Sequence, residues 1–239
     1  MEPYPKIFNM RIGIISEGHA DRAVITNILK GLVGIDSSDI EPLRPIDKFD
    51  ETDKANNDPL IFGGWSSVKA ECETRRIIDE FLSIEGQDFV VIHIDTAEAG
   101  HYGITSPSKS SGTYCEELRV LVVLQIDKWL NKEMDEVILH AVAIEEIDAW
   151  ILPIYDKHNS ANSATPKEKL SRILGRLELD STSDYDNYLL LSKPLSKTKD
   201  IKKGDFLKYN CSLKAFYDEV KSKVLIPPIG DVLQSDVVQ

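Results

Sequence analysis

Carboxylate side chains follow three separate apolar segments of the sequence, and this spacing indicates metal chemistry. Glu17 comes directly after the segment "IGIIS", and Asp21 lies four residues later. Asp95 ends the segment "FVVIHID", Glu98 lies three residues beyond it, and Glu146 lies two residues beyond "LHAVAI". Like charges that lie close together raise the free energy unless a cation compensates them, and carboxylate oxygens suit a hard divalent ion. The pattern predicts a Mg²⁺ (or Mn²⁺) site whose candidate ligands are these five acids.

Each acid alone also has an ordinary structural interpretation. Asp21 could cap a helix or interact with the helix dipole, and Glu98 could be an exposed loop residue. His93 lies two residues before Asp95 on the same strand face. A histidine in that position is more typical of a protein core than of a residue that orients an acid. The metal interpretation depends on the joint occurrence of acids after three apolar segments.

Strands that alternate with helices would position these acids. Apolar runs and helical spacing predict buried strands over 10–16, 89–96 and 136–144, a proline-containing edge strand over 40–46, and helices over 20–34, 65–84 and 113–131. Such alternation is typical of an α/β fold with three layers and a mostly parallel sheet. Functional groups of these folds gather at the carboxyl ends of the strands, where the acids are expected.

The strand pattern ends near residue 156. We interpret residues 1–156 as one α/β domain and residues 157–239 as a mostly helical C-terminal extension packed on it. The polar residues 47–64 predict a long loop, residues 193–205 a Lys-rich loop between C-terminal helices, and the final residues a tail.

Composition indicates an ordinary globular protein with an acidic surplus. The 239 residues carry a formal net charge of -12, which argues against a general DNA coat protein. Residues 166–223 nevertheless contain 13 Lys and Arg against 9 Asp and Glu. An acidic body beside a mildly basic segment could combine metal ligands with a weak nucleic-acid surface, although acidic residues that serve only solubility remain an alternative.

The cysteines and the N-terminus predict a cytoplasmic protein without membrane association. Cys72, Cys115 and Cys211 are odd in number and far apart, so we expect reduced thiols. The N-terminus lacks the features of a secretory signal, and no apolar run reaches the roughly 20 residues of a membrane span.

Four segments resemble the motifs of a known family. "IISEGHADRAVI" resembles the first motif of Toprim domains, and "VVIHIDTAEAG" is similar to the second, which is normally D-x-D at the end of a strand. "AVAIEEIDAWILP" and "LSKPLSKTKDIKKG" resemble signatures of a bacterial and phage-associated Toprim-like family with the form E-[IV]-[ED]-A-W and a late Lys-rich stretch. The match covers nearly the whole chain in order.

The resemblance implies roles for individual residues. Glu17 would be the first acid, a metal ligand or a general acid/base, and Asp21 a further ligand, as in the branch of overcoming-lysogenization-defect nucleases. Asp95 would be the first acid of D-x-D, and Glu146 the acid of the third motif. A late lysine that steadies the charge of a phosphate would be Lys193 or Lys197. The second D-x-D position is Ala97, a departure that Glu98 could compensate from the loop.

The leading hypothesis is a Mg²⁺-dependent nuclease, or a related phosphoryl-transfer enzyme, that acts on DNA or RNA in bacterial defence against mobile elements. Many domains of this kind work beside an ATPase, so the resemblance implies a possible ATPase partner protein, and a homodimer is a further expectation. One alternative is a non-catalytic Toprim-like adaptor or toxin-system component with a degraded metal site. Another is a flavodoxin-like domain that binds a small phosphorylated ligand.

Overall fold

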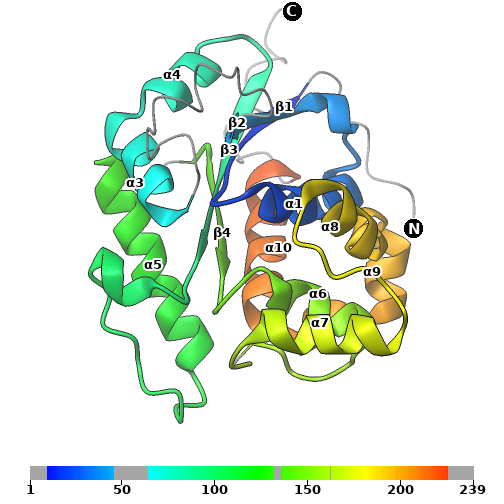
Figure 1. Ribbon diagram of the computed structural model, residues 1–239. Helices are drawn as coiled ribbons and strands as arrows, with labels where there is room; N and C mark the ends of the chain where they lie inside the picture. Colours follow the sequence, from blue (N-terminus) through cyan, green and yellow to red (C-terminus); the bar gives the residue numbers. More distant parts are fainter. Residues whose placement is uncertain (1–9, 46–63, 132–135, 162, 226–239) are drawn as a thin grey trace, which may run out of the picture.

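A parallel sheet forms the centre of the protein. The computed structural model describes residues 10–45, 64–131, 136–161 and 163–225. In this part of the chain, parallel strands pair in the order β2-β1-β3-β4 (Figure 1). They are β1 (Arg11–Ile15), β2 (Ile40–Arg44), β3 (Gln87–Asp95) and β4 (Ile138–Ala143). The predicted α/β fold is confirmed, and the strand order reverses between β1 and β3, where ligands of such sheets bind.

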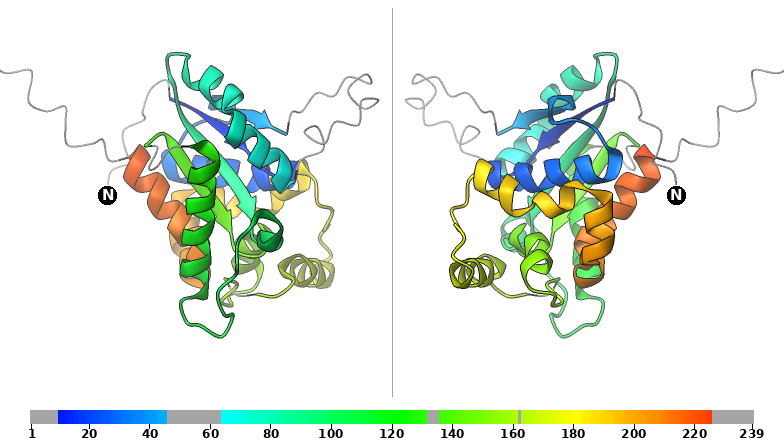
Figure 2. Two further views of the ribbon diagram at one scale, coloured as in Figure 1. Left: turned by 90° about the vertical axis from the view of Figure 1, so that its left-hand side faces the viewer. Right: turned by 90° about the vertical axis from the view of Figure 1, so that its right-hand side faces the viewer.

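Helices cover both faces of the sheet (Figure 2). On one face lie α1 (His19–Val33) and α10 (Cys211–Val224), and on the other α3 (Trp65–Thr74), α4 (Arg76–Leu82) and α5 (Tyr114–Leu130). Two more helices, α8 (Tyr185–Leu191) and α9 (Thr198–Gly204), pack against α1. The remaining α-helices of the described residues, α6 (Asp148–Tyr155) and α7 (Pro166–Arg176), follow the carboxyl end of β4. The result is the expected three-layer arrangement.

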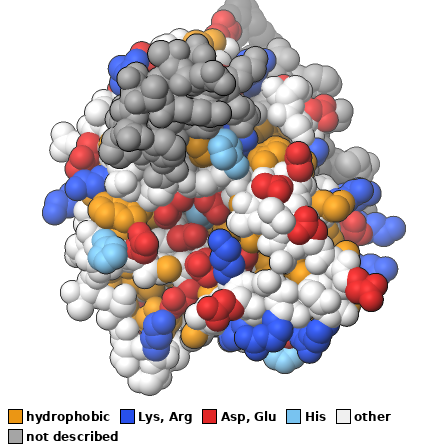
Figure 3. Space-filling model, viewed as in Figure 1, with side chains coloured by type: hydrophobic (Ala, Val, Ile, Leu, Met, Phe, Trp, Pro, Cys, Tyr) orange, Lys and Arg blue, Asp and Glu red, His pale blue; other side chains and the backbone are white. Residues whose placement is uncertain are grey.

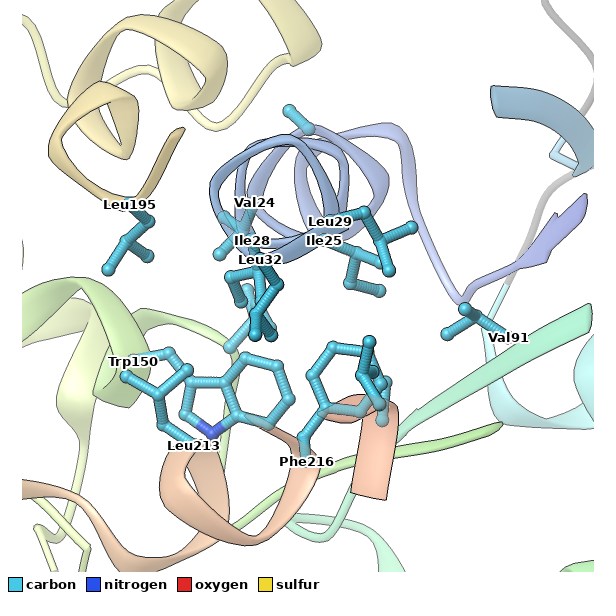
Figure 4. Packing of buried hydrophobic residues seen from close by; sticks show 14 of the residues in the cluster. Val24, Ile25, Ile28, Leu29, Leu32, Val91, Trp150, Leu195, Leu213 and Phe216 are labelled. Carbon is cyan, nitrogen blue, oxygen red and sulfur yellow. The ribbon is translucent and has the colours of Figure 1, made fainter. Parts of the chain in front are cut away.

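The C-terminal helices share a hydrophobic core with the sheet. Val24 and Ile28 of α1 are at most 1% exposed and face Trp150 of α6 and Phe216 of α10 (Figure 4). The rings of Trp150 and Phe216 stack with centroids 5.5 Å apart, and the Trp150 indole N–H donates to Ser212 Oγ at 2.8 Å. Complete burial of such a side chain contributes about 1.5–3 kcal/mol. This core fixes α6, and with it the residues that follow β4.

Several predicted boundaries differ from the structure. The helix predicted over 65–84 is divided into α3 and α4, because Arg75 adopts a left-handed backbone conformation with φ 54°. The predicted Lys-rich loop at 193–205 is mostly helical, with a 3₁₀ helix η4 (Lys193–Ser196) followed by α9, because Leu195 and Ile201 are buried against α1. The loop predicted at 47–64 lies outside the described residues except for its last residue, and the tail lies wholly outside them. None of the helices that the structure describes has the length and hydropathy of a membrane span.

The prediction of three reduced cysteines is wrong for two of them. Cys115 at the start of α5 and Cys211 at the start of α10 form a disulfide, while Cys72 is buried and free. The paired residues are separated by 96 positions and come from opposite faces of the sheet. Their helices both pack against β4, the last strand of the described sheet, and this packing brings the two sulfurs together.

A partly buried charge cluster joins the same two helices across β4. Glu219 of α10 accepts hydrogen bonds from Arg119 of α5 at 2.6 Å and from Lys223 at 3.1 Å, and it lies 2.8 Å from His140 Nδ1. Burial alone would raise the pKa of Glu219, but the hydrogen bond and charge of His140, with Arg119 and Lys223, lower it to about 2. Burial opposes protonation of His140, yet its hydrogen bonds to Asp127 and Glu219 raise its pKa. The cluster holds α5 and α10 in place beside β4.

We expect Glu219→Gln to lower the free energy of unfolding by about 3 kcal/mol, because two partly buried cations and His140 lose their carboxylate partner. The folded pKa of about 2 lies below the ordinary 4.5. The stabilisation that the ionised Glu219 carboxylate provides is therefore complete above about pH 4.5 and is lost as the pH falls toward 2. Urea denaturation at several pH values measures it. Asp218→Asn is the control, because that exposed carboxylate pairs with Lys214 on the surface of the same helix. Its loss should change the free energy of unfolding by less than about 0.5 kcal/mol. Equal losses for the two variants would contradict the assignment.

Candidate metal centre

The turn between β1 and α1 places two acids at the carboxyl end of the sheet. Glu17 follows β1, and Gly18 in extended conformation precedes the first turn of α1, which contains Asp21. Glu17 Oε1 accepts a hydrogen bond from the backbone N–H of Asp95 at 2.7 Å. A Cβ at Gly18 would come within 3.3 Å of Asp21 Oδ2, so a larger residue would crowd that carboxylate. The end of β1 is thus tied directly to the end of β3.

A cavity of about 700 Å³ brings the predicted acids together. Among its lining residues are Glu17, Asp95 and Glu146, which follow or end three neighbouring strands, and Asp21 from the first turn of α1. Figure 3 shows acidic side chains gathered in a hollow at the centre of this face. We call this hollow the acidic cavity. Its other acids are Asp148, Asp184 and Asp186.

His93 lies beneath two of these acids. Its side chain is completely buried, with Nδ1 3.8 Å from Asp21 Oδ2 and Nε2 3.3 Å from Asp95 Oδ1. Its ring stands edge-on to Trp150 with centroids 6.5 Å apart. Neither ring nitrogen of His93, nor Asp95 Oδ1, has a hydrogen-bond partner among the described residues. The sequence alone favoured an ordinary core histidine, whereas the structure sets it between two acids.

Burial and mutual repulsion raise the pKa of the clustered acids. Burial, followed by the charge of Asp95, raises the pKa of Glu17 to about 7. Burial raises the pKa of Asp21 to about 8, with the charges of Asp95 and Glu17 adding to the effect and His93 opposing it. Burial and the charges of Asp148 and Glu146 raise the pKa of Asp95 well above its ordinary value. Among the described residues, the positive charges near these acids do not offset the effect of burial and mutual repulsion.

The turn after β4 separates two adjacent glutamates. Glu145 has a left-handed conformation with φ 65°, and its backbone N–H donates to Thr96 Oγ1 at 2.7 Å. Its carboxylate binds Lys109 at 2.5 Å and does not line the acidic cavity. Glu146 does line it, together with Asp148, whose carboxylate is buried and accepts a 2.5 Å hydrogen bond from Tyr188. Asp148, which occupies the [ED] position of the E-[IV]-[ED]-A-W signature, is therefore an acid of the cavity, although it was not among the five predicted ligands.

Glu98 and Ala97 lie away from the acidic cavity. The side chain of Glu98 is 59% exposed, 4.0 Å from His101, and does not line the cavity. Its charge still contributes weakly to the raised pKa of Glu17. Ala97 is exposed, and its backbone N–H donates to the carbonyl of Glu145 at 2.9 Å. The structure therefore does not bring Glu98 to the position that a second D-x-D acid would occupy.

Lys193 and Lys197 also lie elsewhere. Both are exposed and belong to η4 and its C-cap, which pack on α1 near Gly31. A Cβ at Gly31 would collide with the carbonyl oxygen of Leu195, so glycine is required for this approach. Gly31 is ten residues beyond Asp21, or about 15 Å along the helix.

The cation that the structure brings to the acidic cavity is Lys167. It lies in the first turn of α7, after Pro166, and its backbone N–H donates to Glu146 Oε2 at 3.2 Å. Its charge lowers the pKa of Asp95 and Asp148, opposing the stronger effect of burial. Only a weak signal in the sequence points to Lys167, namely a proline-initiated helix soon after the third acidic segment.

The donor set fits a hard divalent cation. Carboxylate oxygens line the cavity, burial and the charges of neighbouring acids raise the pKa values of Glu17 and Asp21, and Asp95 Oδ1 has no hydrogen-bond partner in the described part of the chain. Among the described residues, three ligand atoms within 4.8 Å of one another occur only at Cys115, Glu116 and Cys211, which include the disulfide. The cavity acids are spaced more widely, so fewer than three would bind a single cation directly in this conformation.

We expect Asp21→Asn to stabilise the protein in the presence of a chelator, by on the order of 3 kcal/mol at pH 8. The folded pKa of about 8 lies above the ordinary 3.8, so ionisation of Asp21 costs stability as the pH rises from about 4 to 8. The advantage of the variant should grow over that interval. Thermal unfolding at several pH values measures it, with Asp88→Asn at the exposed start of β3 as the control. Destabilisation by Asp21→Asn at pH 8 would contradict the repulsion described here.

The comparisons with known proteins do not identify a relative. No protein-family model, no curated protein and no solved structure matches the chain. The resemblance to Toprim domains therefore stays a prediction from short motifs. A functional assignment has to depend on the geometry and charge of the acidic cavity.

Proposed function

We propose that the acidic cavity binds Mg²⁺ (or Mn²⁺) and that the protein is a metal-dependent nuclease that hydrolyses phosphodiester bonds of DNA or RNA. One observation carries the proposal: acids from the ends of β1, β3 and β4 share one cavity although their charges repel one another. Proteins retain such costly arrangements at functional sites. The motif resemblance supports the same chemistry independently of the geometry.

The cavity residues divide into distinct roles in this proposal. Asp95, Glu146 and Asp148 would hold the cation, at most two of them directly and the others through bound water, and Asp148 would supply the acid that the D-x-D pattern lacks at Ala97. A bound divalent cation polarises a phosphoryl oxygen and lowers the pKa of water. Glu17 has a pKa of about 7, which suits the exchange of a proton with water or with the leaving oxygen near neutral pH, if it is not itself a ligand.

Two further residues of the cavity would support the reaction. Asp21, about one helical turn from Glu17, would contact the cation through bound water, and His93 beneath it would limit how far the carboxylates of Asp21 and Asp95 move. The ammonium group of Lys167 would attract the phosphate that is cleaved.

The charge of the cavity argues against the flavodoxin-like alternative. A small phosphorylated ligand would need backbone N–H groups or cations around its phosphate. Carboxylates line this cavity from β1, β3 and α6, and Lys167 is the only Lys or Arg among the described lining residues. An anion would be repelled here unless a metal ion lay between it and the acids.

We expect the metal-free protein to bind Mn²⁺ in calorimetry and to cleave labelled DNA or RNA only after addition of Mg²⁺ or Mn²⁺. Asp95→Asn should abolish metal binding, and Glu17→Gln should lower the cleavage rate by about 10²-fold or more. Glu98→Gln is the matched control, because that carboxylate is exposed and does not line the cavity. Metal binding without cleavage of any nucleic acid would favour the non-catalytic adaptor. Absence of metal binding would refute the proposed site.

The position of Lys167 in the acidic cavity gives a separate prediction. Lys167→Met should reduce the cleavage rate by about 10-fold or more, because a charge that stabilises the transition state is lost. Lys193→Ala and Lys197→Ala should leave the rate within about twofold, since their helix packs near the far end of α1. Steady-state cleavage assays on the three variants measure this. The reverse ranking would restore the late lysines as the phosphate-binding residues.

A further inference from the structure

A second cavity lies beside α7 and has the opposite charge. It has a volume of about 280 Å³ and is formed by α7, the end of α6 and the segment that connects them. Its polar lining includes His158, Asn159, Ser163, Lys169, Arg172 and Arg176. We call it the basic cavity. Its acid is Asp156, which pairs with His158 at 2.6 Å.

Three of the four basic residues of α7 share one face of the helix. Lys169, Arg172 and Arg176 follow one another at spacings of three and four residues, whereas Leu170 and Leu174 are buried. Lys169 Nζ donates to Ser163 Oγ at 2.6 Å. Arg172 and Arg176 are exposed, and within the described residues no carboxylate forms an ion pair with either. Two uncompensated guanidinium groups lie together in a chain whose net charge is -12.

Helix α7 connects the two cavities. Lys167 at its start lines the acidic cavity, and Lys169, two residues later, lines the basic one. Figure 3 shows the acidic hollow at the centre of this face and Lys and Arg side chains along its lower rim. Nine residues separate Lys167 from Arg176, or about 14 Å along the axis. At about 3.4 Å per nucleotide of a stacked strand, that length corresponds to about four nucleotides.

We propose that the basic face of α7 binds the backbone phosphates of a nucleic-acid strand a few nucleotides away from the bond held at the acidic cavity. The inference rests on the proposed function, because that function is what places the bond to be cleaved at the acidic cavity. Guanidinium groups bind phosphate oxygens in bidentate geometry, and contacts to the backbone hold a strand in place without reading its sequence. Lys167 then lies between the strand on α7 and the cation site.

Binding is measured separately from cleavage. Fluorescence anisotropy of labelled single-stranded DNA and RNA with the full chain, in a chelator that prevents hydrolysis, gives the affinity at several salt concentrations. Arg172→Gln/Arg176→Gln should weaken binding about tenfold or more and reduce the slope of log affinity against log salt concentration by about 1.4, since each phosphate contact to a single strand contributes about 0.7. Lys199→Gln/Lys203→Gln on α9 removes the same charge from another exposed surface and should change the affinity by less than about twofold. Circular dichroism confirms that each variant is folded.

Three results would overturn the inference: no strand binding by the parent protein, equal affinities of the parent and the α7 variant, or displacement of the strand by inorganic phosphate as effectively as by unlabelled strand. The last would indicate a free-phosphate site. Hydrolysis of bis(p-nitrophenyl) phosphate with Mn²⁺ tests the proposed function by itself, because this small diester has no neighbouring phosphates. The α7 variant should keep that activity while its KM for long strands rises. A protein that hydrolyses neither substrate would disprove the nuclease while leaving the binding result intact.

Discussion

Electrostatic repulsion among carboxylates at the carboxyl edge of the sheet is the constraint on which the rest of the site depends. Glu17 and Asp95 come from neighbouring strands, and the hydrogen bond from the Asp95 backbone to Glu17 holds them together. Asp21 joins them because the turn at Gly18 starts α1 at once. Burial raises the pKa of all three carboxyl groups, so the folded protein disfavours their ionised forms. A bound cation would relieve the repulsion among the ionised carboxylates, and this relief would contribute to the affinity of the site for the cation.

The surrounding elements keep the acids in this arrangement. The stacked rings of Trp150 and Phe216 fix α6, whose first turn carries Asp148, and Tyr188 of α8 holds that carboxylate by a hydrogen bond. Helix α7 lies below the carboxyl end of β4 (Figure 1) and contributes Lys167 to the cavity. The residues after 156 therefore complete the acidic cavity as well as the hydrophobic core.

The sequence predicts the parts of this structure that local patterns determine. The apolar run before Asp95 forms a strand, the short Ile-rich run before Glu17 forms its neighbour, and the parallel sheet then brings both acids to one edge. Parts that depend on tertiary packing were missed. Lys167 reaches the cavity only because α7 packs beside α6, and a polar segment around Ile201 is helical because one apolar side is buried on α1. The Cys115–Cys211 pair likewise forms only where two helices meet beside β4.

The most direct test of the metal site is a crystal structure of the protein soaked in Mn²⁺, with anomalous diffraction data that locate the metal. The account predicts an anomalous peak in the acidic cavity, within about 2.2 Å of carboxylate oxygens from at least two of the strands β1, β3 and β4. Asp95 should be among the ligands. A cavity without a peak, in crystals whose Mn²⁺ concentration saturates the protein in solution, would contradict the account, as would a peak held only by residues outside the cavity.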